Sequence, residues 1–326
     1  MASLLRYVAL RVLQALFVIV AIACINFLVL HIAPGDAVDI MAGESGVADA
    51  DYLQALRQEY GLDQPLYVQL FRYLLNLARF NLGYAFHYNI SVVDLILERL
   101  PATLLLMVTS LLVALLGGIV LGVTSARHAG SVYDKAISIV SLLGYATPLF
   151  WLGLMLIVAF SLKLNLLPSN GIVTIGAQYS VWGMAIDVIR HLIMPAVTLA
   201  LFFMATYTRL MRAQFLQVAG LDFVRTARAK GISESRVVYR HILRNAVLPL
   251  ISLFGVQVGG VLGGAVVVEV VFGWPGLGRL AFDAIFQRDL NLLMGLLFFS
   301  SILVIAVNLF VDLLYGLLDP RIEIAA

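Results

Sequence analysis

The sequence predicts an all-α fold that crosses a membrane six times. Hydrophobic residues make up 62% of its 326 residues and charged residues only 12%, whereas soluble domains carry about 25% charged residues. Six apolar stretches have the length, about 20 residues, at which a helix crosses a hydrocarbon core of about 30 Å. A helix satisfies its own backbone hydrogen bonds inside lipid. We therefore expect a polytopic membrane protein and exclude a soluble enzyme.

The six expected helices are distributed along the whole chain. They cover about residues 8–32, 101–125, 136–162, 192–216, 246–272 and 291–316. The first apolar run is longer than the roughly 7 to 15 residues of a signal-peptide core, and no clear cleavage site follows it. We expect one transmembrane domain over residues 1–326. It would comprise an N-terminal anchor helix at 1–32, an outer loop at 33–100 and a five-helix core at 101–326, with a cytoplasmic loop at 219–245.

Basic residues set the expected orientation. Arg6 and Arg11 precede the first span, Arg127 and Lys135 lie between the second and third, and a basic segment at 222–249 lies between the fourth and fifth. Cytoplasmic loops of membrane proteins are enriched in Lys and Arg. These segments and both termini are therefore expected in the cytoplasm, with the mainly acidic loop 33–100 on the outer face.

The outer loop is expected to contain two short helices. Residues 52–60 and 67–77 place apolar side chains near helical spacing, and Gly61 and Pro65 separate the two runs. These helices would either pack as a lid on the bundle or bind an external partner. The pattern leaves both interpretations open.

Glycines and prolines indicate where the expected helices pack closely or bend. Small residues four apart let two helices approach each other. Such residues are Gly118 and Gly122 in the second span and Gly255, Gly259, Gly260, Gly263 and Gly264 in the fifth. Pro148, Pro195 and Pro249 remove helix hydrogen bonds in or beside the third, fourth and fifth spans, so bends are expected there.

Glu269 is a charged residue at membrane depth, near the outer end of the fifth span. A charge at the bilayer centre costs at least about 2.5 kcal/mol. Such a carboxylate therefore needs a partner or has a function. We expect Glu269 either to pair with Arg279 or to contribute to a pathway or gate.

The chain lacks the motifs that common catalytic chemistries require. It contains no phosphate-binding G-x-x-x-x-G-K-[ST] loop, no zinc-binding H-E-x-x-H pair and no G-x-S-x-G nucleophile turn. Its five histidines have no ligand-like spacing. We expect no catalytic residue, no metal and no cofactor in this chain, and no ATP hydrolysis by the chain alone.

The basic segment at 222–249 has the pattern of a helix, a turn and a second helix. Asp222 can cap the first helix, Gly231 suits the left-handed residue that ends it, and Ser233 can cap a second helix that runs to about Asn245. Basic side chains on such a segment can hold anionic lipid or insert into a partner protein. The residue pattern alone favours neither.

This segment resembles the cytoplasmic EAA loop of ABC-importer permeases. RTARAKG at 225–231 and HILRNAVLP at 241–249 are similar to the dipeptide and oligopeptide permease group in particular. Arg225 and Thr226 stand where the general pattern has Glu and Ala, a replacement that is usual in the peptide group. Further similar stretches are APGD at 33–36, YGLDQPLYVQ at 60–69, TPLFWLGLMLI at 147–157, VFGWPGLGRL at 271–280 and NLFVDLLYGLLDPRI at 308–322.

The resemblance implies a subunit of an ATP-driven importer in the cytoplasmic (inner) membrane of a bacterium or archaeon. The implied partners are a second homologous permease, two cytosolic ATPase subunits that bind ATP and Mg, an external solute-binding protein and membrane lipid, with no nucleic acid. The ATPase subunits would dock on the EAA loops. The residues that the resemblance assigns to ATPase coupling are Asp222, Arg225, Thr226, Ala227, Arg228, Ala229, Lys230 and Gly231.

The substrates that the resemblance implies are dipeptides, oligopeptides or similar small solutes. Nickel, glutathione or a sugar-derived solute remains an alternative within the family, because the matching motifs serve coupling and folding. A channel or a secondary transporter is the alternative from another class. A secondary transporter would need inverted repeats or an ionisable coupling site at the membrane centre, and no repeat is clear in the sequence.

Overall fold

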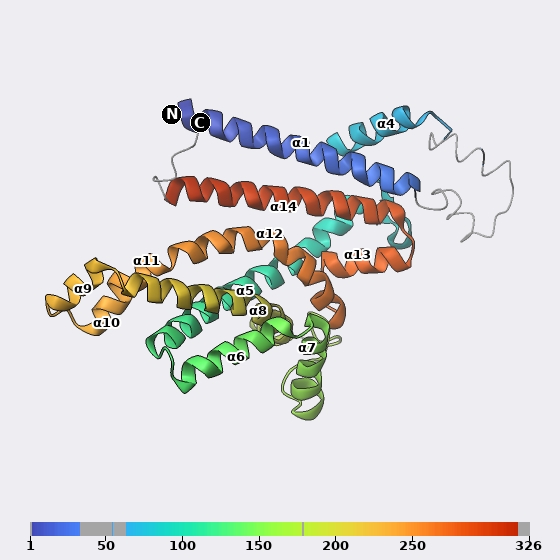
Figure 1. Ribbon diagram of the computed structural model, residues 1–326. Helices are drawn as coiled ribbons and strands as arrows, with labels where there is room; N and C mark the ends of the chain where they lie inside the picture. Colours follow the sequence, from blue (N-terminus) through green and yellow to red (C-terminus); the bar gives the residue numbers. More distant parts are fainter. Residues whose placement is uncertain (1, 33–53, 55–62, 178, 319–326) are drawn as a thin grey trace. The chain divides into compact units, whose positions relative to one another are not determined.

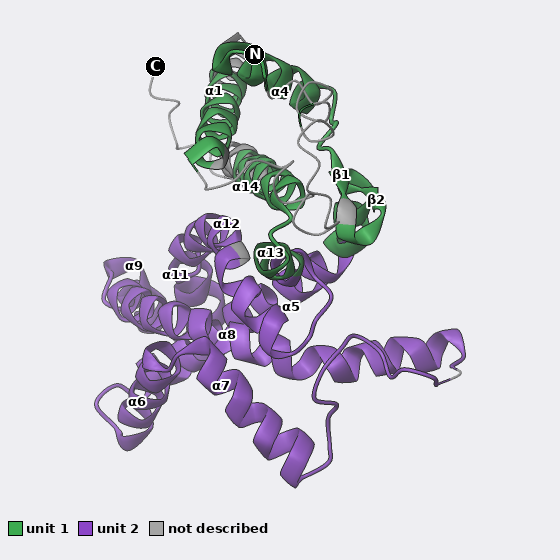
Figure 2. Ribbon diagram, turned by 90° about the vertical axis from the view of Figure 1, so that its right-hand side faces the viewer, with its two compact units in different colours: residues 1–100, 280–326 green, residues 101–279 purple. Residues whose placement is uncertain are grey.

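The computed structural model describes residues 2–32, 54, 63–177 and 179–318, and its regular structure is almost entirely helical. It divides into two compact units, Met1–Leu100 with Leu280–Ala326 and Pro101–Arg279 (Figure 2). The expected all-α class is confirmed, with one small hairpin added. That residues 1–326 form a single domain stays a prediction.

Two long antiparallel helices lie side by side in unit 1, α1 (Ala2–Ile32) and α14 (Leu290–Leu318) (Figure 1). The short helix α4 (Leu66–Ala78) packs against α1. His31 and Gln69 form a hydrogen bond of 3.0 Å between these helices, and Phe27 and Tyr73 are in ring contact. The second of the two helices expected in the outer loop is thus present, while the first, at 52–60, falls outside the described residues except for residue 54.

A two-stranded hairpin follows α4. Strands β1 (Tyr84–Ala85) and β2 (Ile90–Ser91) pair antiparallel, with a 3-10 turn (Phe86–Tyr88) between them. Ser91 then caps α5 (Val92–Arg127), because its hydroxyl accepts a bond of 3.1 Å from the N–H of Asp94. Helix α5 therefore begins nine residues before the expected residue 101, with Pro101 inside it. The apolar run at 101–125 corresponds only to the part of α5 that is hydrophobic enough to lie in the lipid core.

Unit 2 is organised around α8 (Val181–Ala219), against which several helices pack. Leu199, Tyr207 and Met211 of α8 are fully buried. The other elements of this unit are the rest of α5, α6 (Val132–Ala146), α7 (Leu149–Leu156) with a π-helical turn η2 (Ile157–Lys163), α9 (Asp222–Ala229), α10 (Glu234–Arg236), a π-helical turn η3 (Val237–Leu243), α11 (Arg244–Ala246) and α12 (Leu248–Val271). Helix α13 (Leu277–Phe286) begins in this unit and ends in the other.

Glycines let α5 and α8 approach closely, as the sequence predicts. A Cβ added to Gly122 would lie 2.5 Å from the Cβ of Met211, and one added to Gly118 would overlap Tyr207. The glycines of α12 behave differently. A Cβ added to Gly264 would lie 3.2 Å from Leu199 Cδ1, but one added to Gly260 or Gly263 would have no atom of the described chain within 4 Å. Within unit 2, no described residue packs against that part of the α12 surface.

Four described helices, α1, α5, α8 and α14, are long and apolar enough to cross a membrane, and six spans result if each of two bent pairs counts as one. The bend expected beside Pro148 is present in the third expected span, since α6 and α7 meet at 108°. Pro148 lacks an N–H and disfavours the helical conformation of the residue before it, and Thr147 is extended with ψ of 129°. Pro249 lies in the first turn of α12, after a bend of 42°, whereas Pro195 lies inside α8.

Candidate functional site

Helix α9 has one buried face and one exposed face. Val224 and Ala227 are buried at 0% and 5% exposure. They belong to the same core cluster as Phe215 and Val218 at the end of α8. Phe223 and Arg225 are exposed on the other face. The helix is thus held by two small apolar side chains and offers a mixed basic and apolar surface.

The start of α9 differs from the expectation. Leu221 is the N-cap residue and Asp222 is already helical, so Asp222 does not cap with its side chain. Its carboxylate lies in the first turn, where a negative charge interacts favourably with the helix dipole. Thr226 donates a hydrogen bond of 2.9 Å to the Asp222 carbonyl. Asp222 and Thr226 therefore stabilise the first turn, and the carboxylate remains almost fully exposed, 3.6 Å from Arg225.

The end of α9 has the geometry that the sequence predicts. Gly231 has a φ of +72°, in the left-handed region that favours glycine. Its N–H donates to the carbonyl of Arg228 at 2.9 Å, and the N–H of Ile232 donates to the carbonyl of Ala227 at 3.3 Å. These two bonds define a Schellman motif. The chain therefore reverses sharply after α9 with its last carbonyls satisfied.

A two-bond ion pair closes the same turn. Arg228 donates from Nε to one oxygen of Glu234 at 3.1 Å and from a terminal nitrogen to the other at 2.8 Å. The hydrogen-bonded carboxylate of Glu234 raises the pKa of Arg228 above its usual range. Arg228 and Glu234 join α9 to the first turn of the next helical segment. Arg228 thus supports the shape of the loop. The sequence did not predict its contact with Glu234.

The second helical segment runs from Glu234 to Ala246 through α10, η3 and α11. Its length agrees with the expected end near Asn245, but Ser233 makes no side-chain capping bond and the middle turn is π-helical. Val237 and Ile242 of this segment are fully buried and belong to the core cluster that includes α8 residues. The segment packs on α8 and α9 and leads directly into α12.

A second charged cluster joins the ends of α5, α6 and α8. Arg212 donates two bonds of 2.8 Å to the carboxylate of Asp134. The Ser125 hydroxyl and the Gly130 N–H donate to the same carboxylate, which is nearly buried. A buried charge is tolerated when such bonds surround it. This cluster was not predicted, because its main partners are 78 residues apart in the sequence.

Glu269 is fully buried and lies in a network near the C-terminal end of α12. Its oxygens accept bonds from the Thr103 hydroxyl at 2.7 Å and from the backbone N–H of Arg279 at 3.0 Å. Thr103 accepts a further bond from the N–H of Leu277 at 2.8 Å. The expected pairing with Arg279 therefore occurs through its backbone. Its guanidinium instead donates to the carbonyl of Gly273 at 2.6 Å.

Two glycines make room for the Glu269 carboxylate. A Cβ on Gly276 would overlap the carboxylate, and a Cβ on Gly278 would lie 2.6 Å from the Cα of Val266 and 3.0 Å from a Glu269 oxygen. The indole of Trp274, also fully buried, donates a bond of 2.8 Å to the carbonyl of Ala102. The turn 272–279 is thus tied to both α5 and α12.

Family models match most of the chain. "Binding-protein-dependent transport system inner membrane component" covers residues 118–324, and the corresponding N-terminal model covers residues 4–107.

The chain belongs to the binding-protein-dependent transport system inner membrane component family.

Similar proteins match this permease over nearly its whole length. Oligopeptide transport system permease protein AppB of Bacillus subtilis (strain 168) is 41% identical over 97% of this chain and 99% of its own. Di/tripeptide transport system permease protein DppB of Pseudomonas aeruginosa (strain UCBPP-PA14) is 41% identical over 93% and 94%. Dipeptide transport system permease protein DppB of Escherichia coli (strain K12) is 38% identical over 93% and 94%. The family indicated by the EAA-loop resemblance is confirmed.

A solved structure also has a similar fold. It is described as inward-facing conformations of the MetNI methionine ABC transporter, and it matches the permease with a TM-score of 0.54 and 16% identity, over 70% of this chain and 97% of that chain. At this identity the match supports the fold alone. The permease is therefore a multi-pass membrane protein with the fold of an ABC importer transmembrane subunit.

Proposed function

We propose that this permease carries dipeptides, oligopeptides or similar small solutes across the inner membrane in an ATP-driven importer. The similarity to AppB and the two DppB proteins supports this proposal most directly. These three relatives are named for oligopeptide, di/tripeptide and dipeptide transport, and they align over 93–97% of the chain at 38–41% identity. Alignments over 93–97% of the chain include membrane helices as well as the loop at 222–249.

The importer that we propose has five subunits. A second homologous permease completes the translocation path, two cytosolic ATPases bind ATP and Mg, and an external solute-binding protein delivers the solute. The family description names dependence on a binding protein. The chain itself contains no phosphate-binding loop. Its basic loops favour a cytoplasmic position for α9 and for both termini.

Helix α9 is proposed as the element that docks on an ATPase subunit. Closure of the ATPase pair would displace α9, and the segment at 234–246 would pass the displacement to α12 because both pack against α8. The coupling residues then fall into two groups by exposure and bonding. Arg225, Ala229 and Lys230 are exposed and would contact the ATPase, whereas Asp222, Thr226, Ala227, Arg228 and Gly231 hold the shape of the helix and its turn.

Glu269 is proposed to act at the outer gate by fixing the end of α12. Its carboxylate joins α12 to Thr103 of α5 and to the backbone at the start of α13. A movement of α12 that opens the path would have to shift or break these bonds. Glu269 would thus contribute to gating as part of a latch, without contact to the solute.

Reconstitution tests the transport proposal directly. The permease, purified with its partner subunits and placed in vesicles with the external binding protein, is expected to accumulate labelled dipeptide only when ATP and Mg are present on the ATPase side. Competition by unlabelled dipeptide, but not by nickel or glutathione, would support the peptide assignment. ATP-independent uptake by the permease alone would contradict it.

Charge-reversal variants can distinguish a residue that holds the shape of the loop from one that contacts the ATPase. Arg228→Glu is expected to reduce ATPase retention and uptake, and the swapped pair Arg228→Glu with Glu234→Arg is expected to restore both, because the intramolecular pair is rebuilt. Arg225→Glu serves as the comparison. Its loss of ATPase retention should not be restored by Asp222→Arg. Restoration in both cases, or in neither, would overturn this division of roles.

A further inference from the structure

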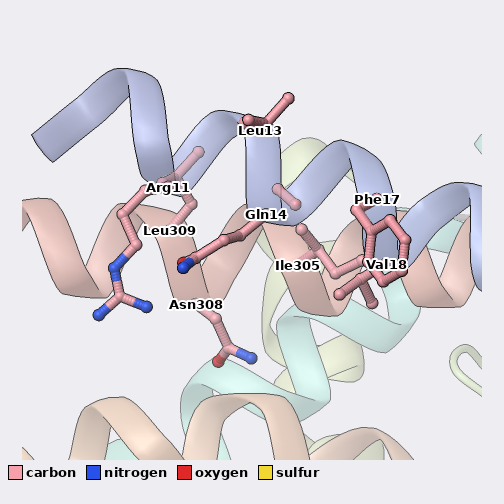
Figure 3. Close-up of a pocket in the computed structure, with 9 residues that line it drawn as sticks. Arg11, Leu13, Gln14, Phe17, Val18, Ile305, Asn308 and Leu309 are labelled. Carbon is pink, nitrogen blue, oxygen red and sulfur yellow. The ribbon is translucent and has the colours of Figure 1, made fainter. Parts of the chain in front are cut away.

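Asp134 of α6 is enclosed by the protein, unlike the polar side chains that line a groove. Arg11 and Asn308 of unit 1, for example, line a groove between α1 and α14 (Figure 3). The Asp134 side chain is only 8% exposed, and it accepts two bonds of 2.8 Å from Arg212 of α8 and one from the Ser125 hydroxyl of α5. A buried ion pair that is pulled apart leaves an uncompensated charge, which is strongly unfavourable. Asp134 and Arg212 are therefore expected to stay together when their helices move.

The turn between α5 and α6 is fixed to the same residue. Gly130 has a φ of +82° and donates its N–H to the Asp134 carboxylate at 2.9 Å. Ser131 caps α6, because its hydroxyl accepts a bond of 3.4 Å from the N–H of Asp134. The turn, the start of α6 and the side of α8 are thus joined at one point.

Arg212 lies close to the helix that we propose docks on an ATPase subunit. It stands seven residues before Ala219, the last residue of α8, a rise of about 10 Å, and α9 begins at Asp222. Phe215 of α8 and Val224 of α9 belong to the same core cluster. Because the end of α8 and α9 are packed together, a displacement of α9 would also act on Arg212.

On the other side of the ion pair, α6 leads to the far end of α12. Helix α6 is followed directly by α7, and α7 packs against α12. A Cβ added to Gly153 of α7 would lie 3.1 Å from Val271 and from Phe272, which follow Glu269 closely in the sequence. The contacts of α7 therefore reach the end of α12 that carries Glu269, whereas the segment at 234–246 leads into its beginning.

We propose that Asp134 and Arg212 are positioning residues for coupling: their ion pair makes α6 follow α8 when an ATPase subunit displaces α9, so that the displacement reaches both ends of α12. This role rests on the proposed docking of α9. Other contacts also hold α6 on α8, since Tyr145 stacks on Phe202 with ring centroids 5.3 Å apart. Loss of the ion pair would thus leave α6 in place but would let its first turns move independently of α8.

The uptake of labelled dipeptide per ATP hydrolysed, measured in vesicles with the full complex, tests this role. Asp134→Asn removes the charge, and Arg212→Lys keeps the charge but cannot make two parallel bonds. Both variants are expected to retain the ATPase subunits and to hydrolyse ATP, while uptake per ATP falls about fivefold, the lower end of typical coupling between two sites. If the Asp134→Asn complex cannot be purified, Arg212→Lys decides.

Lys135→Gln is the matched control. It removes an exposed charge one residue from Asp134 and should leave uptake per ATP unchanged. Uptake per ATP equal to that of the wild type in Arg212→Lys would overturn the proposal. A loss of uptake that only follows a loss of ATPase retention would also overturn it, since the pair would then merely stabilise the fold.

Arg225→Glu separates these results from the proposed function. If this variant keeps its ATPase subunits, the docking of α9 is wrong, and the role of the ion pair falls with it. If Arg225→Glu loses the ATPase while Arg212→Lys transports like the wild type, only the role of the ion pair is wrong.

Discussion

At the scale of single residues, the basic side chains of α9 have different roles. Arg228 is used inside the loop, where it makes two bonds to Glu234. Arg225 lies 3.6 Å from the exposed carboxylate of Asp222, and its own side chain is 73% exposed. Exposed ion pairs contribute about 0.2 to 1 kcal/mol, so the Arg228 pair sets the geometry of the turn more than it stabilises the fold.

Gly231→Val is expected to impair ATPase retention and uptake. A side chain at a φ of +72° is strained by about 1 to 2 kcal/mol, and a β-branched one is particularly unfavourable. The surroundings are not the cause, because a Cβ at this position would have no described atom within 4 Å. Co-purification of the ATPase and uptake in vesicles measure the effect.

Gly231→Asn is the matched control, since asparagine adopts the left-handed conformation more readily than other side chains. It should retain most of the activity that Gly231→Val loses. Equal losses in the two variants would show that the backbone conformation is not the reason for glycine at this position.

Glu269→Gln is expected to lower the thermal stability of the detergent-solubilised permease while leaving membrane insertion intact. The two carboxylate oxygens accept from Thr103 and from the Arg279 N–H. An amide offers one oxygen only, so one buried donor loses its acceptor, at a cost of about 1 to 3 kcal/mol. The melting temperature measures this change.

Glu98→Gln is the control for Glu269→Gln, because the Glu98 side chain is 63% exposed. Its effect should stay within about 0.5 kcal/mol. A Glu269→Gln protein as stable as the wild type would contradict the network described for Glu269. Unchanged uptake would contradict its proposed role at the gate.

At the scale of elements, glycines with the same spacing have different surroundings. Gly122 of α5 lies directly against α8, whereas Gly263 of α12 has open space beside it in the described chain. Helix propensity favours alanine over glycine by about 1 kcal/mol at both positions. Packing therefore decides whether a glycine-to-alanine substitution raises or lowers the stability of the permease.

Gly122→Ala is expected to destabilise the permease, because the added Cβ would lie 2.5 Å from Met211. Gly263→Ala should leave the stability of the isolated chain unchanged or slightly raised. Thermal unfolding in detergent compares the two variants. If Gly263→Ala instead prevents co-purification of the second permease, this surface of α12 is a subunit contact. Equal stability of the two variants would contradict the close α5–α8 packing.

Sequence patterns predicted the apolar parts of these elements better than their ends. The first turns of α5 contain the charged residues Asp94, Glu98 and Arg99. Because the spans were predicted from uninterrupted apolar runs, these turns were not included in the predicted helix. Pro148 predicted a bend but not its angle of 108°. Gly231 was predicted because a left-handed residue depends on local sequence. The Asp134–Arg212 and Glu269–Thr103 contacts join distant segments, and local periodicity contains no information about them.

At the scale of the whole molecule, the orientation that we propose rests on the distribution of basic residues, and labelling can test it. Cys24 is the single cysteine of the sequence. In a Cys24→Ser background, a membrane-impermeant maleimide applied to right-side-out vesicles is expected to label Ala177→Cys but not His128→Cys. His128 follows α5 beside Arg127 on the proposed cytoplasmic side, and Ala177 lies between η2 and α8. Permeabilised vesicles should label both positions, and the reverse pattern in intact vesicles would invert the topology.

The Schellman turn and the Arg228–Glu234 pair have a mechanical consequence. A loop that had to become ordered on docking would lose conformational entropy with every binding event, and part of any applied displacement would be absorbed in rearranging it. The α9 turn is already fixed by its own hydrogen bonds in the single chain. If α9 docks on an ATPase subunit as proposed, it would act as a rigid element, and the displacement of α12 would then depend on how far the ATPase subunit moves.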